Sequence, residues 1–352
     1  MKYDYGVIGN HEFDHGWQQI LEFRKTATHP LLCANVYTPD GQIIGDASYE
    51  IKDLDGMKVG IIGVNSVLSP FRGNVMEQKV RLEDVTKCLK RLIPEVRPKC
   101  DLLVVLSHCG ADTDKKFAAN AELKGIDIIV GGHAGSTGDK GIQVSSTYIV
   151  QNTGYAEVTF DLNTKRIVSF VVKNLREEVE PLSPDPKVER LIADWEKKLD
   201  KELNITIANN PASLSKDEII LFVGKAMRES VGTDFAYPFG YHIPNRWLEG
   251  LPAGPVTLRD VFLEFPYPEL IINLKCQGDK LGKYFLEDAK NRGLVIISDK
   301  EYTIAVGSMD VGGKIKGFGG GPYGGRESTE ILIRDAIIDH IKKKGFKLKE
   351  KP

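Results

Sequence analysis

The sequence predicts a two-domain protein of the layered α/β class. Its 352 residues correspond to about two domains at roughly 150 residues each. In the first half, short runs rich in Val, Ile and Leu alternate with stretches of helical periodicity, which is typical of a sheet covered by helices. A proline-rich stretch at 181–186 separates this half from a long amphipathic segment and a second set of strands and helices. These observations predict two folded bodies joined by a helix.

The first body, at 1–182, is expected to contain six strands followed by an antiparallel hairpin. The strands are predicted at 4–8, 31–36, 58–64, 101–107, 126–131 and 147–151. Helical spacing of apolar residues predicts helices at 17–26, 83–93 and 112–124. Residues 156–173 alternate apolar with polar side chains and predict the closing hairpin.

A linker helix is predicted at 183–204, because apolar residues three and four apart share one face after Pro186. The second and smaller body, at 205–352, is expected to be α/β as well. Its predicted helices are 217–230, 279–290 and 328–344, and its predicted strands are 270–275, 294–298 and 302–307. The glycine-rich stretch 312–325 lacks the spacing of a P-loop and is interpreted as a surface loop.

Composition and charge exclude several functional classes. The net charge of −2 argues against a protein that coats nucleic acid or an anionic membrane, because both need a basic excess. No apolar run approaches the roughly 18–20 residues that span a bilayer. The five cysteines are isolated, which excludes a CxxC metal knuckle and a dense disulfide framework. The expected partner is a small molecule, and the oligomeric state and localisation stay open.

Three histidine-bearing segments follow predicted strands. They are GNHEFDHG at 9–16, SHCG at 107–110 and GGHAG at 131–135. In an open α/β sheet, the carboxyl ends of the strands form the crevice in which sites are built. A single histidine after a strand is more often structural, but three such segments, which hold four of the seven histidines, favour a metal site. Imidazole ligands suit zinc, manganese or iron.

The segments GNHEFD, LSHCG and IDIIVGGHAG resemble motifs of the metallophosphoesterase superfamily, specifically its 5′-nucleotidase family. The stretch LPAGPVTLRDV at 251–261 is similar to the C-terminal domain of that family, so the resemblance covers most of the chain. It implies a metallophosphatase-type β-sandwich flanked by helices, linked by a long helix to a substrate-binding domain. It also implies that two divalent metal ions act as cofactors, orient a water for in-line attack and neutralise charge on the phosphoryl oxygens.

By this resemblance, Asn10, His108 and His133 are ligands of one metal ion. His11 would not be a ligand and would stabilise the transition state or protonate the leaving oxygen. Asp14 would hold the ring of His11 in one orientation. A carboxylate on the second ring nitrogen also raises the pKa of a histidine that must stay partly protonated.

The sequence departs from the family pattern at the other metal. The Asp-x-His and Gly-Asp segments that supply its ligands and the bridging aspartate lie upstream of GNHE in the family. Only eight residues precede Gly9 here, and a start inside the natural protein is the simplest explanation. The third family motif continues Gly-His-x-His or Gly-His-x-Gln, whereas this chain has Gly135 at that position. Only one ligand set is therefore visible.

Four side chains are candidates to replace the ligand that Gly135 lacks. Ser136 and Asp139 lie close to it in sequence. Asp112 and Asp114 could also reach the site, although their position favours the N-cap and first-turn charge of a helix.

The second body is expected to carry the substrate pocket. In the family, an Asn-x-Gly-Gly-x-Arg run supplies an arginine for the substrate, and two aromatic rings sandwich the base. That run is missing from 234–254. The candidate residues here are Arg246, with one ring from Phe239 or Tyr241 and the other from Phe318 or Tyr323. Ordinary packing is the alternative interpretation of each.

The sequence thus predicts a divalent-metal-dependent phosphoester hydrolase that acts on a nucleoside 5′-monophosphate, a cyclic nucleotide or a nucleotide-sugar. One alternative is a catalytically degenerate nucleotide-binding protein, which Gly135 and the missing arginine run favour. Another is a hydrolase of a sulfur or other non-nucleotide ester on the same scaffold, because the pair Arg246–Trp247 resembles the thiosulfohydrolase branch.

Overall fold

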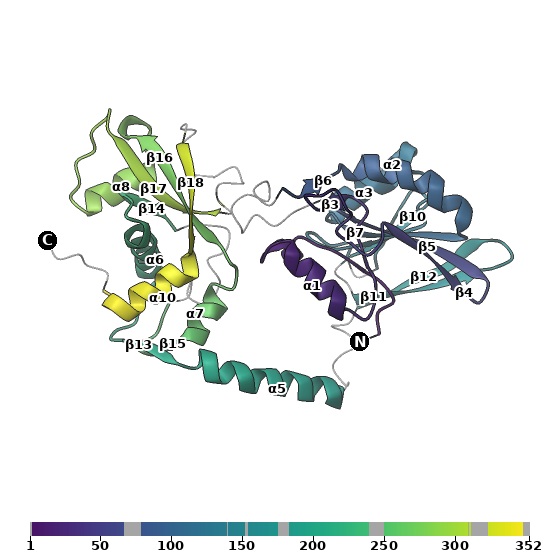
Figure 1. The fold of residues 1–352 in the computed structure, drawn as a ribbon, viewed down its shortest axis with the longest axis horizontal. Helices are drawn as coiled ribbons and strands as arrows, with labels where there is room; N and C mark the ends of the chain where they lie inside the picture. The colour runs from purple at the N-terminus through teal and green to yellow at the C-terminus, as the bar shows by residue number, and fades with distance from the viewer. Residues whose placement is uncertain are drawn as a thin grey trace. The chain divides into compact units, whose positions relative to one another are not determined.

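The computed structural model describes residues 2–66, 79–138, 140–151, 154–174, 183–238, 250–308, 310 and 323–347. They form two compact units, which divide between Ser183 and Pro184. Each unit has its own sheet and its own hydrophobic core (Figure 1). The mixed α/β class is the one that the sequence predicts.

Unit 1 is built on a six-stranded mixed sheet in the order β4-β5-β7-β8-β10-β9. The central strands β5, β7, β8 and β10 run parallel to one another, and β4 and β9 are antiparallel edge strands. The carboxyl ends of the parallel strands therefore lie along one edge of the sheet. The bounds are β4 Tyr49–Leu54, β5 Met57–Asn65, β7 Leu102–His108, β8 Ile128–Gly131, β9 Ile142–Val144 and β10 Thr147–Gln151.

One face of this sheet is covered by helices α2 (Val85–Val96) and α3 (Ala111–Ala119) (Figure 1). Helix α2 forms because its apolar residues recur at helical spacing, and because the carboxylate of Asp84 accepts a hydrogen bond from the backbone N–H of Lys87 at 2.9 Å. Its buried side chains pack on alternate residues of β5 and β7, and these three elements share one core.

The opposite face meets the hairpin β11 (Gly154–Asp161) and β12 (Arg166–Asn174). Phe160, Ile167 and Phe170 of the hairpin pack against the residues of the sheet that point away from α2. A mainly apolar cavity of about 510 Å³ separates the rest of the hairpin from the sheet.

The described part of unit 1 also contains two short strand pairs and helix α1. Strand β1 (Gly6–Val7) pairs with β2 (Leu31–Leu32), and β3 (Val36–Tyr37) pairs with β6 (Arg81–Leu82). The backbone of Ala34 donates to the carbonyl of Gly63 at 2.7 Å, so this segment runs against β5. A Cβ at Gly63 would lie 2.5 Å from the Cβ of Leu32, and glycine permits this close approach. Helix α1 spans Gln18–Thr26.

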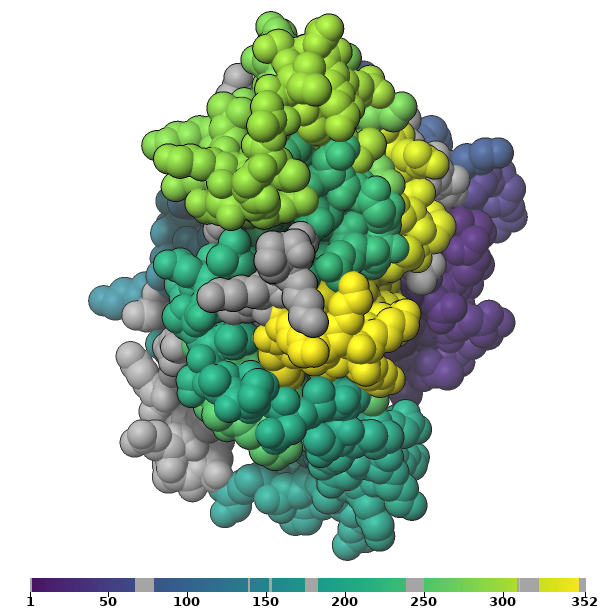
Figure 2. Space-filling model, turned by 90° about the vertical axis from the view of Figure 1, so that its left-hand side faces the viewer, coloured from purple at the N-terminus to yellow at the C-terminus, as the bar shows by residue number. Residues whose placement is uncertain are grey.

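Unit 2 contains a four-stranded sheet in the order β14-β17-β16-β18 and a separate pair, β13 with β15. Helix α6 begins at a capping box formed by Ser215 and Glu218 and ends at Gly232, which has φ 70°. It packs with α10, which Figure 2 shows in yellow, around one apolar core. The strands are β13 Thr206–Asn210, β14 Phe235–Tyr237, β15 Gly254–Thr257, β16 Leu270–Gln277, β17 Glu301–Gly307 and β18 Gly324–Leu332, and the helices are α5 Pro186–Leu203, α6 Lys216–Val231, α7 Leu258–Glu264, α8 Lys283–Asn291 and α10 Ile333–Lys344.

Two predictions for the second body are wrong. The first five residues of the predicted helix 328–344 belong to β18, and α10 begins only at Ile333. The apolar run 294–298 is not a strand, and Val295 is 84% exposed. Among the described residues, no helix is both long and apolar enough to cross a bilayer.

Candidate metal centre

Three side chains predicted as metal ligands converge at the carboxyl edge of the sheet in unit 1. The side-chain oxygen Oδ1 of Asn10 lies 2.8 Å from Nε2 of His108 and 3.2 Å from Nδ1 of His133. The centroids of the two imidazole rings are 5.1 Å apart. Ligand atoms bound about 2.1 Å from one cation lie roughly 3 Å from one another, so this spacing fits a shared ion.

Asn10 is held by the tight turn that follows β1. The 3-10 turn His11–Phe13 begins directly after it, and the carboxylate of Glu12 accepts a hydrogen bond from the backbone N–H of Gly9 at 2.7 Å. A Cβ on Gly9 would lie 2.7 Å from Cε1 of His108. Glycine at position 9 therefore lets the imidazole of His108 approach the turn, and Asn10 itself is only 5% exposed.

His133 lies in a loop with unusual backbone geometry. Its φ of 78° is in the left-handed region, which is rare for a residue with a side chain. The loop is fixed by the start of α3, because the backbone N–H groups of Gly110 and Ala111 donate to the carbonyls of Gly132 and Ala134 at 3.0 and 2.9 Å. A strained loop beside a convergent set of polar atoms is typical of a functional site.

Burial keeps His108 neutral. Removal of the ring from water is the main cause that lowers the pKa of His108 to about 4, and the neighbouring His133 and His11 lower it further. A neutral imidazole with an available lone pair is the form that binds a divalent cation. Within the described part of the chain, no group of three or more His, Cys, Asp or Glu side chains is placed to hold a metal, so the candidate set depends on the amide of Asn10.

His11 and Asp14 form a pair beside these three residues. Nδ1 of His11 lies 2.8 Å from Oδ2 of Asp14. The side chain of His11 is 52% exposed, whereas that of Asp14 is 10% exposed. A mostly buried carboxylate therefore orients a ring that reaches solvent, which is the arrangement that the resemblance implies.

The described candidates for the missing ligand make other contacts. Gly135 has φ 83°, and a Cβ there would lie 3.0 Å from the Cβ of Ala111. The hydroxyl of Ser136 accepts a hydrogen bond from the backbone N–H of Gly138 at 3.1 Å. The side chain of Asp112 is 93% exposed and pairs with Lys115 at 3.3 Å. Asp139 lies outside the described residues.

Asp112 and Asp114 lie in the first turn of α3, as the sequence predicts, but neither of them is the N-cap. Helix α3 is capped by Gly110 without a side-chain hydrogen bond, and Asp114 is fully buried. Its Oδ1 accepts a hydrogen bond from the hydroxyl of Ser107, the residue before His108, at 2.6 Å. Its Oδ2 has no hydrogen-bond partner among the described residues. The only sequence signal for this contact is the polar residue Ser107 at the end of an apolar strand.

Replacing Asp114 with asparagine is expected to change the pH dependence of stability. Burial raises the pKa of Asp114 from 3.8 to about 6, so its contribution to stability is present below about pH 4 and is lost as the pH rises through 6. Asn does not titrate. From about pH 4 to about pH 8, the free energy of unfolding should therefore move by about 2 to 3 kcal/mol in favour of Asp114→Asn over the wild type.

Denaturant unfolding at several pH values measures this difference. The matched control is Asp112→Asn, because Asp112 lies in the same helical turn but is exposed. A difference between Asp114→Asn and the wild type that stays constant with pH would contradict the burial argument.

Comparison with known proteins adds an independent line of argument. No protein-family model matches the chain. The chain is 24% identical to Protein UshA of Yersinia enterocolitica over 80% of its own length and 62% of that protein. It is also 24% identical to a 5′-nucleotidase of Vibrio vulnificus, over 80% of this chain and 61% of that one. The chain resembles the 5′-nucleotidase family of metallophosphoesterases.

Solved structures share the fold of this chain. A candidate 5′-nucleotidase of Staphylococcus aureus superposes with a TM-score of 0.71 and 18% identity, over 98% of this chain and 81% of that chain. The sulfate thiohydrolase SoxB of Thermus thermophilus superposes with a TM-score of 0.64 and 16% identity, over 97% and 70%. The chain thus has the fold of these proteins, and it spans about three fifths of the length of the curated relatives that it matches.

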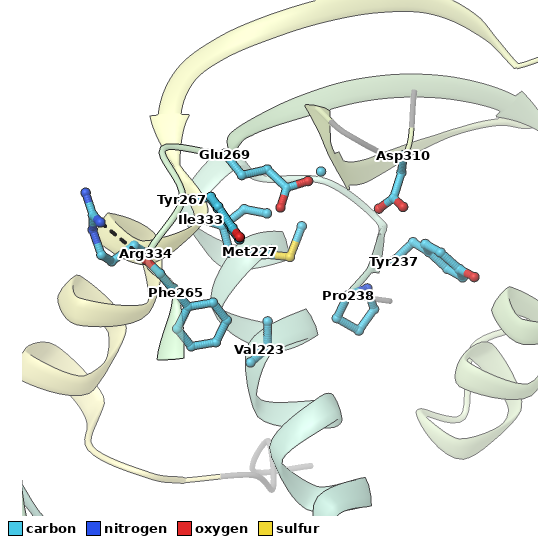
Figure 3. Close-up of a pocket in the computed structure, with 11 residues that line it drawn as sticks. Val223, Met227, Tyr237, Pro238, Phe265, Tyr267, Glu269, Asp310, Ile333 and Arg334 are labelled. Atoms are coloured by element: carbon cyan, nitrogen blue, oxygen red, sulfur yellow. Dashed lines mark hydrogen bonds between the residues drawn. The ribbon is translucent and has the colours of Figure 1, made fainter. Parts of the chain in front are cut away.

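The predicted substrate-binding residues Arg246, Phe239 and Phe318 lie outside the described residues, as does Tyr241. Unit 2 nevertheless has a described pocket, which is lined in part by Tyr237, Pro238 and Asp310. Figure 3 shows the carboxylates of Glu269 and Asp310 pointing into this space, above the apolar side chains of Val223 and Met227. Burial raises the pKa of Asp310 to about 6. The free volume is about 30 Å³, which holds a water molecule but not a nucleobase.

Proposed function

We propose that this protein is a divalent-metal-dependent phosphoester hydrolase that acts on nucleotides. The observation that carries the proposal is the convergence of Asn10 Oδ1, His108 Nε2 and His133 Nδ1 at the carboxyl edge of the sheet. Relatives named 5′-nucleotidase align with the chain across both units, which supports a phosphoric ester as the substrate.

Asn10, His108 and His133 would hold one divalent cation. When bound, such a cation neutralises charge on the phosphoryl oxygens and lowers the pKa of water. The chain itself determines where the cation would bind, because the turn at Gly9 and the loop at His133 bring one amide oxygen and two ring nitrogens close together. The second cation of the family has no complete ligand set among the described residues.

His11 would act on the phosphoester itself. Asp14 fixes its ring through Nδ1, so proton exchange with a bound substrate would run through Nε2. A protonated imidazole there stabilises negative charge that develops on the leaving oxygen, and it can then deliver the proton to that oxygen.

Unit 2 would supply the substrate-binding domain, as the assignment of 205–352 predicts. Arg246 is proposed to bind the phosphate or ribose, and Phe239 and Phe318 to stack on the base. The pocket beside Glu269 and Asp310 is too small for a nucleotide, so these three residues carry the proposed recognition of the substrate.

The test is turnover by the full-length protein loaded with Mn²⁺ or Zn²⁺. We expect phosphate release from a nucleoside 5′-monophosphate, a cyclic nucleotide or a nucleotide-sugar, and we expect EDTA to abolish it. The panel includes a thiosulfate ester and a simple sugar phosphate at the same metal loading.

Two other outcomes would replace the proposal. Nucleotide binding without turnover would identify a degenerate binding protein, which the left-handed Gly135 in place of a ligand favours. Turnover confined to the sulfur ester or the sugar phosphate would identify a different hydrolase, which the fold similarity to SoxB permits.

A further inference from the structure

The buried side chain of Gln151 contacts the loop that carries His133. Gln151 is the last residue of β10, and it pairs in register with Gly131, the last residue of β8. It is 1% exposed. Its amide nitrogen Nε2 donates toward the backbone carbonyls of Gly132 at 3.0 Å, Ala134 at 2.7 Å and Gly135 at 3.4 Å. These carbonyls flank His133 on both sides.

The backbone of Gln151 is tied to the far end of the same loop. Its N–H donates to the hydroxyl of Thr137 at 2.9 Å, and its carbonyl accepts from that hydroxyl at 3.4 Å. Thr137 is 7% exposed. Gln151 therefore contacts the loop before and after His133, across residues 132–137.

The hydrogen bonds also fix the orientation of the Gln151 carboxamide against a flip that would exchange its nitrogen and oxygen. Three acceptors fix which end of the carboxamide is nitrogen, because a carbonyl oxygen in that place would face three other carbonyls. A side chain at Gly131 would prevent the arrangement, since a Cβ there would lie 2.6 Å from Oε1 of Gln151 and 2.5 Å from Oδ2 of Asp114.

We propose that Gln151 is a positioning residue for His133: its carboxamide holds the loop in the left-handed conformation that turns the ring of His133 toward Asn10. A residue that needs φ 78° does not keep it without support from its surroundings. Loss of the carboxamide lets the loop relax, and Nδ1 of His133 then moves away from Oδ1 of Asn10. The consequence for metal affinity rests on the proposed function, whereas the effect on the ring of His133 does not.

The test is Gln151→Met, which keeps the length of an unbranched side chain and removes the donor. The carbonyls of Gly132 and Ala134 keep their hydrogen bonds to the backbone of α3, so the variant is expected to fold. The matched control is Thr147→Val in the same strand, where a buried hydroxyl donates to the carbonyl of Ile126 at 2.8 Å, away from the loop.

Two readouts are compared. In the metal-free protein, the imidazole NMR signals of His133 should shift or broaden in Gln151→Met and remain unchanged in Thr147→Val. Affinity for Mn²⁺ or Zn²⁺, measured by calorimetry, should fall about 10- to 100-fold in Gln151→Met, as for other residues that orient a ligand. It should stay within about twofold of the wild type in Thr147→Val.

Unchanged His133 signals in Gln151→Met would overturn the proposal, and so would equal effects of the two variants. Shifted signals in a protein that binds no metal would support the positioning role and reject the metal centre, so the two failures are distinguishable. If Gln151→Met does not fold, Thr137→Val removes only the hydroxyl that ties Gln151 to the loop. Smaller changes in the His133 signals and in metal affinity are then expected in Thr137→Val. Their absence would reject the positioning role of Gln151.

Discussion

Replacing His11 with alanine should lower kcat for a nucleotide substrate by roughly 10²- to 10⁴-fold and leave the metal content of the protein unchanged. The side chain of His11 is half exposed and its Nδ1 is held by Asp14, so the ring is oriented toward solvent at the site. His11 is not one of the three candidate metal ligands, Asn10, His108 and His133, whose ligand atoms converge. The measurements are steady-state kinetics and elemental analysis of the same preparations.

The matched control is His15→Ala, because His15 follows the same turn and is exposed. We expect its kcat to remain near that of the wild type. A loss of metal in His11→Ala would mean that His11 is a ligand, and an unchanged kcat would remove it from the chemistry.

Replacing His108 with alanine should weaken binding of Mn²⁺ or Zn²⁺ by at least about 100-fold, because removing a ligand costs more than disturbing the groups that orient it. Nε2 of His108 is one of three converging donors, and the ring is neutral because its pKa lies near 4. His108→Ala therefore removes a metal ligand that is already deprotonated at neutral pH. Calorimetric titration of the metal-free protein measures the change.

His29→Ala is the control for a histidine of the same unit, since His29 packs against the ring of Tyr3 instead of the converging atoms. Its metal affinity should equal that of the wild type. Equal binding by His108→Ala and the wild type would show that the ion, if any, sits elsewhere.

Local sequence patterns predict most of unit 1. The parallel strands β5, β7, β8 and β10 lie within about two residues of their predicted bounds, because each is a short apolar run that ends at glycine or polar residues. The helix α5 follows from apolar residues at helical spacing after Pro186. The same reasoning places the histidines at strand ends, since the ends are visible in the sequence.

Patterns of this kind fail where the outcome depends on a distant partner. The run 294–298 reads as a strand, but no strand in the described part of the chain pairs with it, and Leu294, Val295 and Ile297 are exposed. Residues 328–332 read as part of a helix, but they pair with β16. No local signal marks a strand whose partner lies about sixty residues away.

The supports of the candidate site are hidden from the sequence for the same reason. Asp114 reads as a helix-start carboxylate, and only the fold shows that it is buried against Ser107. Gln151 reads as the polar end of an apolar strand, and its acceptors are backbone carbonyls of another loop. The histidines at strand ends can be recognised from residue type and position, whereas the burial of Asp114 and the contacts of Gln151 cannot.

The central claim is that Asn10, His108 and His133 bind one divalent cation. Anomalous X-ray scattering from crystals grown with Zn²⁺ or Mn²⁺ tests it most directly, because it locates the ion without reference to activity. We predict an anomalous peak enclosed by Oδ1 of Asn10, Nε2 of His108 and Nδ1 of His133. A metal-loaded crystal with no peak there, or with its peak on other residues, would contradict the account.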